Sequence, residues 1–263
     1  MQQHAPRPSG PTGDGDNIIE TRGLTKEFLG FVAVRDVNLK VKRHTIHALI
    51  GPNGAGKTTV FNLLTKFLRP TSGSIHFNGV DVTRTAPADM AGQGMVRSFQ
   101  ISSVFSHLTV LENVRVALQR PLGISFHFWK PRRTLHPLHE RADELIEWVG
   151  LTPYRDVNAG ELSYGRKRAL EFATTLALEP EMLLLDEPMA GLGHEDIHRI
   201  SSLIKRVAAN RTVLMVEHNL SVVADLSDTI TVLTRGSVLA EGDYAAVSTN
   251  PSVREAYIGG VHA

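Results

Sequence analysis

The chain has 263 residues, 42% of them hydrophobic and 21% charged, which is the composition of an ordinary packed globular protein. Its 28 Lys and Arg residues nearly balance 27 Asp and Glu residues, so the formal net charge of +1 excludes bulk charge as a means of holding nucleic acid or an anionic membrane. The sequence contains no Cys, which excludes disulfides and thiolate-ligated metal and suits a reducing compartment.

The N-terminal region combines a polar tail with a β-rich segment. Residues 1–17 are rich in Pro, Gly and polar side chains and predict a flexible tail. From Ile18 to Ile50, short β-branched and partly alternating runs predict several strands. No run approaches the roughly 18–20 apolar residues that span a bilayer, so we expect any work at a membrane to be done from its surface.

A glycine-rich loop, GPNGAGKTT at 51–59, follows these strands. The apolar residues of segment 58–68 then recur at helical spacing, which predicts a helix that stops before Pro70. These residues are Val60, Leu63, Leu64, Phe67 and Leu68. The loop is therefore expected between a strand and a helix.

Residues 101–180 change to a helical period, which predicts an inserted helical region. Its clearest apolar face consists of Leu138, Ala142, Leu145, Ile146 and Val149. Beyond Pro180, short strand-like runs return at 182–188, 212–218 and 228–243, around a helical stretch at 194–209. Strands that alternate with helices predict an α/β fold with a mainly parallel sheet.

The loop at 51–59 satisfies the G-x-x-x-x-G-K-[ST] pattern in the strand-loop-helix context that the pattern requires. Gly51 and Gly56 let backbone N–H groups wrap phosphates, and Lys57 places a positive charge on the β- and γ-phosphates. The Thr58 hydroxyl is expected to ligate Mg²⁺. The loop is therefore predicted to bind a nucleoside triphosphate.

Two acids follow the apolar run MLLL at 182–185. A buried strand of this kind places Asp186 and Glu187 at its carboxyl end, where open α/β sheets bind their ligands. Asp186 is predicted to bind Mg²⁺, directly or through water, and Glu187 to polarise the attacking water as general base. A solvated turn that carries two acids is the alternative interpretation.

A third strand, TVLMV at 212–216, ends in Glu217 and His218. At that position His218 is predicted to hydrogen-bond the γ-phosphate and to steady its charge during cleavage.

The segment ELSYGRKRALEFATTLA at 161–177 carries a second candidate anion site. Ser163 and Gly165 stand at the head of an apolar-periodic helix, whose first backbone N–H groups lack internal partners and whose dipole favours negative charge. Ser163 is also a suitable helix N-cap, and the two interpretations are compatible. The residues alone leave open which anion this helix end receives.

Several motifs stand in the order and spacing of an ABC-type ATPase, and the chain resembles this family from about Ile18 to its C-terminus. They are GPNGAGKTT at 51–59, SFQ at 98–100, LSYGR at 162–166, LLLDEP at 183–188, AGLG at 190–193 and EHN at 217–219. The resemblance implies an α/β P-loop NTPase with a RecA-like, mainly parallel core, an N-terminal antiparallel β subdomain and an inserted α-helical subdomain. It places the core at 18–100 and 181–263 and the helical subdomain at 101–180.

The resemblance implies ATP and Mg²⁺ as cofactors. It also implies that Ser163 and Gly165 cap the γ-phosphate of an ATP held by the P-loop of a second subunit, and that the loop at 190–193 communicates between the two sites. The nucleotide-binding residues are then Phe28, Gly51, Pro52, Asn53, Gly54, Ala55, Gly56, Lys57, Thr58, Thr59, Ser163 and Gly165.

Two further roles come from the resemblance alone. Gln100 looks like the glutamine that reaches Mg²⁺ and the attacking water while its loop touches a transmembrane partner. Phe28 looks like the aromatic residue that stacks on adenine, with an ordinary core Phe as the alternative. The catalytic set is then Glu187, His218 and Gln100, and the metal set is Thr58, Gln100 and Asp186.

The chain departs from the commonest family patterns at two places. Arg166 replaces the usual Gln after the signature glycine, and AGLG at 190–193 lacks the frequent Asp or Asn-Pro. We expect turnover to survive both changes.

The segments MVRSFQ, LTVLENV, ELSYGRKRALEFA and VLAEGDYAAVSTNPSVREAYIGG look like the ATP-binding subunits of branched-chain amino acid importers, whose relatives also carry urea and amides. This resemblance implies transmembrane permeases, a second ATPase subunit, which is identical or different, and indirectly an extracytoplasmic substrate-binding protein. It places the chain peripherally on the cytoplasmic face of the plasma (inner) membrane. A soluble ABC ATPase that acts as an assembly scaffold is the alternative from another class.

Overall fold

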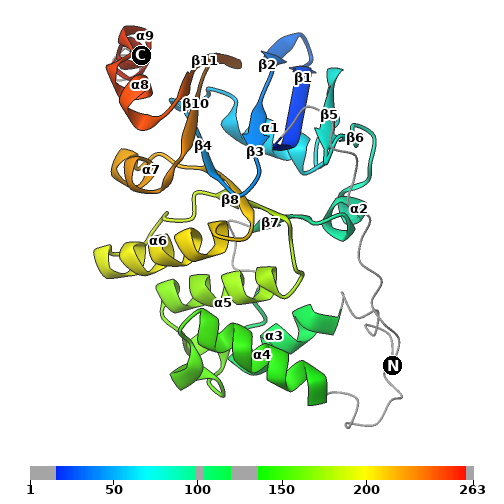
Figure 1. The fold of residues 1–263 in the computed structure, drawn as a ribbon, viewed down its shortest axis with the longest axis vertical. Helices are drawn as coiled ribbons and strands as arrows, with labels where there is room; N and C mark the ends of the chain where they lie inside the picture. Colours follow the sequence, from blue (N-terminus) through cyan, green and yellow to red (C-terminus); the bar gives the residue numbers. More distant parts are fainter. Residues whose placement is uncertain (1–15, 99–103, 120–135, 259–263) are drawn as a thin grey trace.

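The computed structural model describes residues 16–98, 104–119 and 136–258. The fold combines an antiparallel sheet, a six-stranded sheet and a set of helices (Figure 1). The antiparallel sheet lies at one end of the molecule and the helices between residues 110 and 176 lie at the other, with the six-stranded sheet between them. The α/β architecture expected from the sequence is confirmed.

The antiparallel sheet is built around its first strand. Its strands are β1 (Asn17–Phe28), β2 (Phe31–Val37), β3 (Lys40–Lys42), β5 (Ser72–Phe77) and β6 (Val80–Asp81). The long strand β1 pairs antiparallel with β2, β3 and β5, and β6 closes the edge against β5. Because β1 begins at Asn17, ordered structure includes the last residue of the predicted tail.

The six-stranded sheet has the order β11-β10-β4-β9-β8-β7. Its strands are β4 (Ile46–Ile50), β7 (Met95–Ser98), β8 (Met182–Asp186), β9 (Thr212–Val216), β10 (Thr229–Thr234) and β11 (Ser237–Gly242). All neighbours are parallel except β10 and β11, which form an antiparallel hairpin. Every residue of β4, β8 and β9 is buried, as expected for parallel strands covered on both faces.

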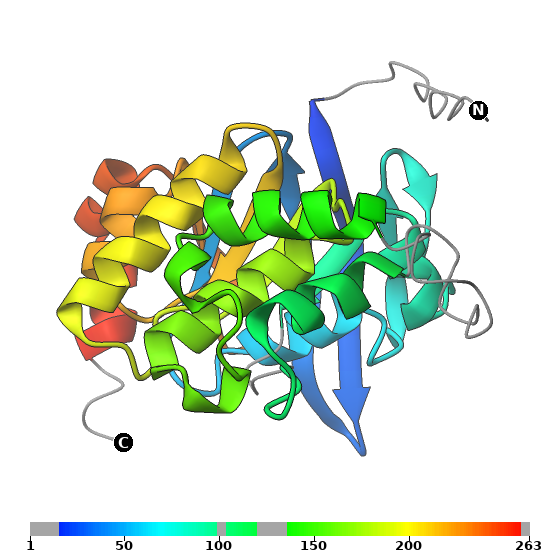
Figure 2. The same cartoon turned by 90° about the horizontal axis from the view of Figure 1, so that it is seen from below.

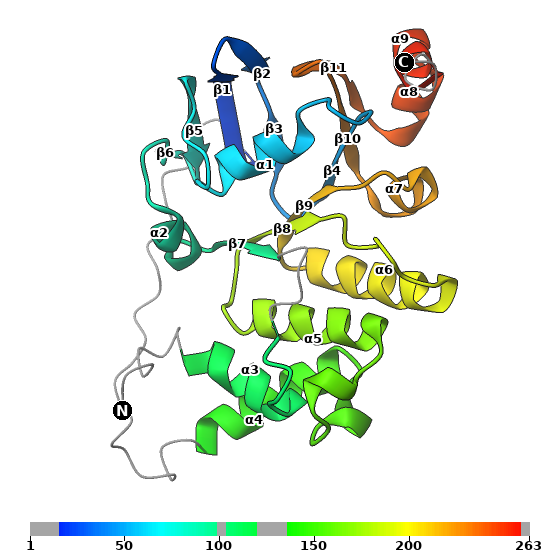
Figure 3. The ribbon, with the colours of Figure 1, turned by 180° about the vertical axis from the view of Figure 1, so that it is seen from behind.

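Helices connect these strands and cover the sheets. They are α1 (Lys57–Leu64), α2 (Pro87–Gly92), α3 (Val110–Gln119), α4 (His136–Trp148), α5 (Tyr164–Leu176), α6 (His194–Ala208), α7 (Leu220–Leu226), α8 (Tyr244–Thr249) and α9 (Pro251–Ile258). Helix α1 lies on the opposite side of the sheet from α5 and α6 (Figure 3). Viewed from below, α3, α4 and α5 pack side by side as one helical group (Figure 2).

Two apolar cores lie on the two faces of the six-stranded sheet. Alternate residues of β8 separate them, because Leu183 and Leu185 join the core shared with the helices, while Leu184 joins the core shared with α1 and the antiparallel sheet. The predicted apolar face of residues 138–149 is buried in the first core, and its helix is α4. The period-two pattern of the strands therefore holds both layers on one sheet.

The helix after the glycine-rich loop is shorter than predicted. It ends at Leu64, so the expectation that Phe67 and Leu68 continue its apolar face is wrong. The Thr65 hydroxyl donates to the Phe61 carbonyl at 2.7 Å, and Lys66 takes a left-handed conformation with φ of 65°, which turns the chain away. Among the described residues, none of the helices is both long enough and apolar enough to cross a membrane.

Candidate functional site

Three neighbouring strands end together at one edge of the parallel sheet. In the register of β4, β9 and β8, Val216 pairs with Leu49 on one side and with Asp186 on the other. The chain leaves β4 as the loop at 51–59, leaves β8 at Glu187 and leaves β9 at Glu217. Because parallel strands share their carboxyl edge, the sequence motifs that follow them are brought to one site, as predicted.

Two glycines let the phosphate loop approach its neighbours closely. Gly51 has φ of 152°, and a Cβ there would lie 2.2 Å from the Leu233 carbonyl oxygen. Gly56 has φ of 100°, and a Cβ there would lie 2.7 Å from the Ala33 carbonyl oxygen. A side chain at either position would collide with fixed backbone, so the loop requires glycine for shape as well as for phosphate access.

Helix α1 begins at the end of this loop and presents a binding site for anions. Its first internal hydrogen bond runs from the Val60 N–H to the Gly56 carbonyl at 2.9 Å, so the N–H groups of residues 57–59 precede the helical ladder. The first turn carries no acidic residue. The helix dipole and these donors therefore favour a phosphate at this end.

The Lys57 side chain folds back over the loop. Its Nζ donates to the Gly51 carbonyl at 2.6 Å and to the Pro52 carbonyl at 3.0 Å. Partial burial lowers the pKa of the Lys57 ammonium below its usual value, and the nearby Glu187 carboxylate opposes that shift. The ammonium thus lies inside the loop, where a phosphate would meet it.

The two acids after β8 occupy different environments. Asp186 is the last residue of the buried strand, and its side chain is only 3% exposed. Glu187 follows with a left-handed φ of 46° and a side chain that is 33% exposed, and its N–H donates to the Val216 carbonyl at 3.0 Å. The turn at Glu187 therefore leaves the Glu187 carboxylate partly exposed, while the Asp186 carboxylate stays buried at the end of the strand. A solvated turn with two acids, the alternative interpretation, would expose both carboxylates.

His218 and Glu187 face each other across the site. His218 Nδ1 lies 3.9 Å from Glu187 Oε1, and the imidazole is 65% exposed. Glu217, by contrast, is buried and accepts hydrogen bonds from the backbone N–H groups of Met189 at 2.9 Å and His218 at 3.1 Å. Glu217 thus ties the end of β9 to the segment after β8, which carries Glu187.

The segment LSYGR at 162–166, called the signature segment below, leads into helix α5, which is the signature helix. Ser163 is the N-cap residue of α5, as predicted, yet its hydroxyl makes no capping hydrogen bond and is exposed to solvent. Gly165 is buried, and a Cβ there would lie 2.1 Å from the carboxyl carbon of Asp196. The helix end is therefore closely packed on one side and open at its tip.

The two departures from the family pattern have structural partners. The Arg166 guanidinium stacks on the Tyr154 ring, with 4.1 Å between its central carbon and the ring centroid. At the second departure, a Cβ on Gly191 would lie 3.4 Å from the Tyr164 ring, so the 190–193 loop runs past the signature segment. Arg166 thus packs within its own subunit.

The two residues assigned by resemblance alone have different outcomes. Phe28 lies at the end of β1 and is 40% exposed, with Lys26 Nζ 4.9 Å from its ring centroid. It is therefore an exposed aromatic residue rather than part of the core. Gln100 lies outside the described residues, so its predicted roles stay predictions.

The residues at this edge fit a magnesium ion. Mg²⁺ takes oxygen ligands and is usually held by one or two protein groups together with phosphates and water. The Asp186 carboxylate at the end of β8 and the Thr58 hydroxyl in the first turn of α1 are such oxygen ligands at the shared strand edge. Within the part of the chain that the structure describes, no group of three His, Asp or Glu side chains forms a cage of its own.

Sequence reasoning missed two residues of this site, Arg97 and Glu217. Arg97 Nη2 donates to Asp186 Oδ2 at 2.5 Å, and Arg97 Nη1 donates to Asn62 Oδ1 at 2.7 Å. A charged residue inside the short strand sequence MVRS was the available signal for Arg97. Glu217 offered a similar signal, as an acid at the end of an apolar strand.

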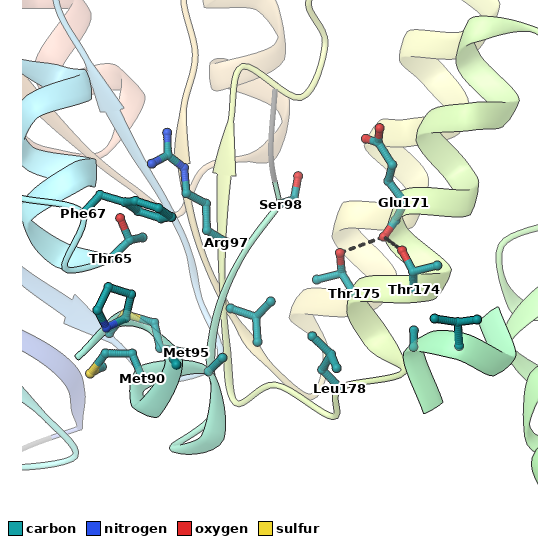
Figure 4. A pocket seen from close by; sticks show the side chains of 16 residues that line it. Thr65, Phe67, Met90, Met95, Arg97, Ser98, Glu171, Thr174, Thr175 and Leu178 are labelled. Carbon is teal, nitrogen blue, oxygen red and sulfur yellow. Dashed lines mark hydrogen bonds between the residues drawn. The ribbon is translucent and has the colours of Figure 1, made fainter. Parts of the chain in front are cut away.

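A groove lies beside this site, between the parallel sheet and the helical group (Figure 4). Its volume is about 490 Å³, and its walls come from β7, α2, α3, α5 and the segment after α1. The apolar part of the lining includes Phe67, Met90, Met95, Val116 and Leu178. The groove reaches Ser98, the last described residue before Gln100.

Known proteins match the chain over most of its length. The family described as "ABC transporter" matches residues 34–190, and the family described as "Branched-chain amino acid ATP-binding cassette transporter" matches residues 237–263. The high-affinity branched-chain amino acid transport ATP-binding protein BraF of Pseudomonas aeruginosa is 41% identical over 249 residues, which cover 92% of this chain and 98% of that protein. LivG of Escherichia coli K12, with the same description, is 38% identical over the same shares.

Solved structures agree with these relatives. A nucleotide-free ATP-binding cassette from an ABC transporter superposes with a TM-score of 0.80 at 31% identity, covering 92% of this chain and 99% of that one. A cassette in its ADP conformation gives the same TM-score at 32% identity and the same coverage. The motif order, the shared strand edge and these matches lead to one conclusion: the chain belongs to the ABC transporter family, as an ATP-binding cassette.

Proposed function

We propose that this chain is the ATP-hydrolysing subunit of an importer for branched-chain or related hydrophobic amino acids. The observation that carries the proposal is that Lys57, Asp186, Glu187 and His218 lie at one edge of the parallel sheet. The same chain exposes Ser163 at the start of the signature helix. The substrate class follows from the relatives, which are described as branched-chain amino acid transport ATP-binding proteins.

Phosphoryl transfer depends mainly on positioning and charge stabilisation, and each residue has a matching task. The N–H groups of α1 and the Lys57 ammonium bind the β- and γ-phosphates. Glu187 accepts a proton from the attacking water, and His218 donates to the γ-phosphate. Thr58 and Asp186 would hold Mg²⁺, together with Gln100 as the resemblance implies; when bound, the ion would neutralise phosphate charge.

The signature helix supports a shared site. Ser163 is exposed at the start of α5 and makes no capping hydrogen bond, and the first N–H groups of a helix suit the γ-phosphate of an ATP held by a second subunit. One solved relative is described as a dimeric post-hydrolysis state bound to ADP and phosphate; at 24% identity it supports the fold. We propose that two such subunits, identical or different, enclose two ATP molecules.

The groove supports a permease contact. Its exposed rim residues Phe67 and Val116 are 55% and 39% exposed, and the loop that follows Ser98 is the one that the resemblance assigns to a transmembrane partner. We propose that an apolar segment of the permease fills this groove on the cytoplasmic side of the inner membrane.

Co-purification and uptake test the proposed function. The chain, expressed with its permeases and receptor protein in vesicles, should drive ATP-dependent uptake of leucine, isoleucine and valine. Uptake of urea or amides in place of these amino acids would correct the substrate, and absence of any co-purifying permease would favour the soluble scaffold.

Val116→Asp tests the groove. The charge should abolish permease capture because the groove is largely apolar, while ATP binding by the single chain stays unchanged. Val80→Asp, at a residue that is 63% exposed on β6, is the matched control and should leave capture intact.

A further inference from the structure

Arg97 lies in strand β7 and connects three parts of the molecule. Its guanidinium bonds Asp186 at the end of β8 and Asn62 in α1, and its central carbon lies 6.0 Å from the centroid of the Phe61 ring. Its side chain is 12% exposed and that of Asp186 is 3% exposed, so water screens this ion pair weakly. Arg97 also lines the groove, as Figure 4 shows.

The pair changes what a metal ion meets at Asp186. Among the described residues, Arg97 is the one side chain that donates a hydrogen bond to this carboxylate. A buried carboxylate needs a counterion, because an unpaired charge away from water is costly. Arg97 supplies that counterion in this structure. A divalent cation that binds Asp186 would then meet the positive charge of the Arg97 guanidinium, which is bound to the same carboxylate.

The Arg97 guanidinium is not held on every side. Within the described residues, its buried Nε has no hydrogen-bond partner, whereas Nη1 is anchored by Asn62 on the helix that follows the phosphate loop. The side chain therefore has a second anchor that does not depend on Asp186. A guanidinium with two anchors can keep one of them while its contact with the other weakens.

We propose that Arg97 is an internal counterion of Asp186 that competes with Mg²⁺ for this carboxylate, and so weakens metal binding while stabilising the chain when Asp186 carries no metal. Arg97 is thus a positioning residue that acts through Asp186. The inference rests on the proposed function, because that function places Mg²⁺ at Asp186.

The test measures metal affinity separately from activity. Mn²⁺ is titrated by paramagnetic resonance into the chain loaded with a non-hydrolysable ATP analogue. Arg97→Met, and Arg97→Gln as a second uncharged variant that keeps hydrogen-bond donors, should bind Mn²⁺ roughly tenfold more tightly, since a nearby positive charge is removed. Arg97→Lys retains the charge and should bind Mn²⁺ as the unmodified chain does.

Thermal unfolding supplies the second readout. Without metal, Arg97→Met should melt several degrees below the unmodified chain, because Asp186 loses its partner; with Mn²⁺ and the analogue the difference should shrink. Arg155→Met removes ion pairs to Asp143 at 2.6 Å and to Asp156 at 2.8 Å, neither of which is a proposed metal ligand, and serves as the control that leaves Mn²⁺ affinity unchanged.

The outcomes separate the two levels of inference. Unchanged or weaker Mn²⁺ binding in both uncharged variants overturns the competition. Asp186→Asn should lower Mn²⁺ affinity; if it does not, the metal assignment of the proposed function fails, whatever the Arg97 variants do.

Discussion

Two regions of this chain are built differently. We call the carboxyl edge of β4, β8 and β9 with the loop at 51–59 the phosphate-loop half, and the signature segment with helix α5 the signature half. In the first, buried strands end together and place Lys57, Asp186 and Glu187 at one edge, with Glu217 fixing the turn beside them. In the second, Ser163 is the N-cap residue of a single helix, and its side chain is exposed and makes no capping hydrogen bond. The polar groups of the first half include pairs formed within the chain, whereas the exposed Ser163 of the second half makes no capping hydrogen bond.

This difference agrees with the proposal that hydrolysis needs a second subunit. The buried Glu217 carboxylate already accepts hydrogen bonds within the chain, whereas Ser163 makes no capping bond and the first N–H groups of a helix lack intrahelical partners. The two halves should therefore fail in different ways when each is damaged. Damage to the first should show in the chemistry, and damage to the second should show only in the assembled complex.

The largest effect is expected from Glu187→Gln. If Glu187 is the general base that we propose, its loss should lower ATP hydrolysis by about 10²–10⁴-fold, while ATP binding at the phosphate loop should persist. Phosphate release measures the first quantity, and gel filtration with ATP should reveal an accumulated dimer. Glu195→Gln, at an exposed acid in the first turn of α6, is the control and should hydrolyse normally. Turnover at the unmodified rate in Glu187→Gln would remove Glu187 from its role.

The next largest effect is expected from Ser163→Arg, which fills the open helix tip. Hydrolysis by the assembled complex should fall by about 10²-fold or more, because the arginine would block the donors that we propose for the γ-phosphate. Equilibrium binding of ATP to the single chain should stay unchanged, since the chain's own loop is intact. Ser202→Arg, at an exposed position of α6, should affect neither quantity. If the single chain loses ATP affinity in Ser163→Arg, the two halves are not separate.

The two halves also differ in how far sequence predicted them. The phosphate loop could be predicted because its glycines, Lys57 and Thr58 stand at a fixed spacing within one short segment. Strand β8 could be predicted because a continuous apolar run is typical of a buried parallel strand. The Arg97–Asp186 pair could not, since it joins residues 89 positions apart through strand register. The early end of α1 also escaped prediction, because it depends on the local Thr65 bond and the turn at Lys66. The anion that we propose for Ser163 is held by a second subunit, so the sequence of one chain could not identify it.

A buried histidine makes the stability of the phosphate-loop half depend on pH. His47 lies in β4, directly before the loop, and burial lowers its pKa from 6.5 to about 4. The Thr231 hydroxyl donates to Glu241, so it accepts from His47 Nε2 at 2.8 Å, which fixes the neutral tautomer. The strand that leads into the phosphate loop therefore contains an uncharged imidazole.

The pH dependence follows from that shift. Between pH 6.5 and about 4 the unfolded chain binds a proton that the folded chain excludes, so stability is full above pH 6.5 and falls as pH drops toward 4. The loss should approach about 3 kcal/mol in the free energy of unfolding, measured by urea titration at each pH. His47→Gln should lack this component of the slope, whereas His198→Gln, at an exposed position of α6, should retain it. Equal slopes in all three proteins would contradict the assignment.

The smallest effect is expected at the edge of the phosphate-loop half, from Phe28→Ala. If the exposed ring stacks on adenine, its removal should weaken ATP binding by about 1 kcal/mol, roughly fivefold in Kd, and Phe28→Tyr should restore it. Phe31 is 68% exposed on the same hairpin, so Phe31→Ala removes an equally large ring from a neighbouring position and is the matched control. Calorimetric titration with ATP compares the three variants. An equal loss in both alanine variants would indicate a general effect of the hairpin, and no loss in either would remove Phe28 from the site. A selective loss in Phe28→Ala would extend the organised half from the sheet edge to the tip of the antiparallel sheet.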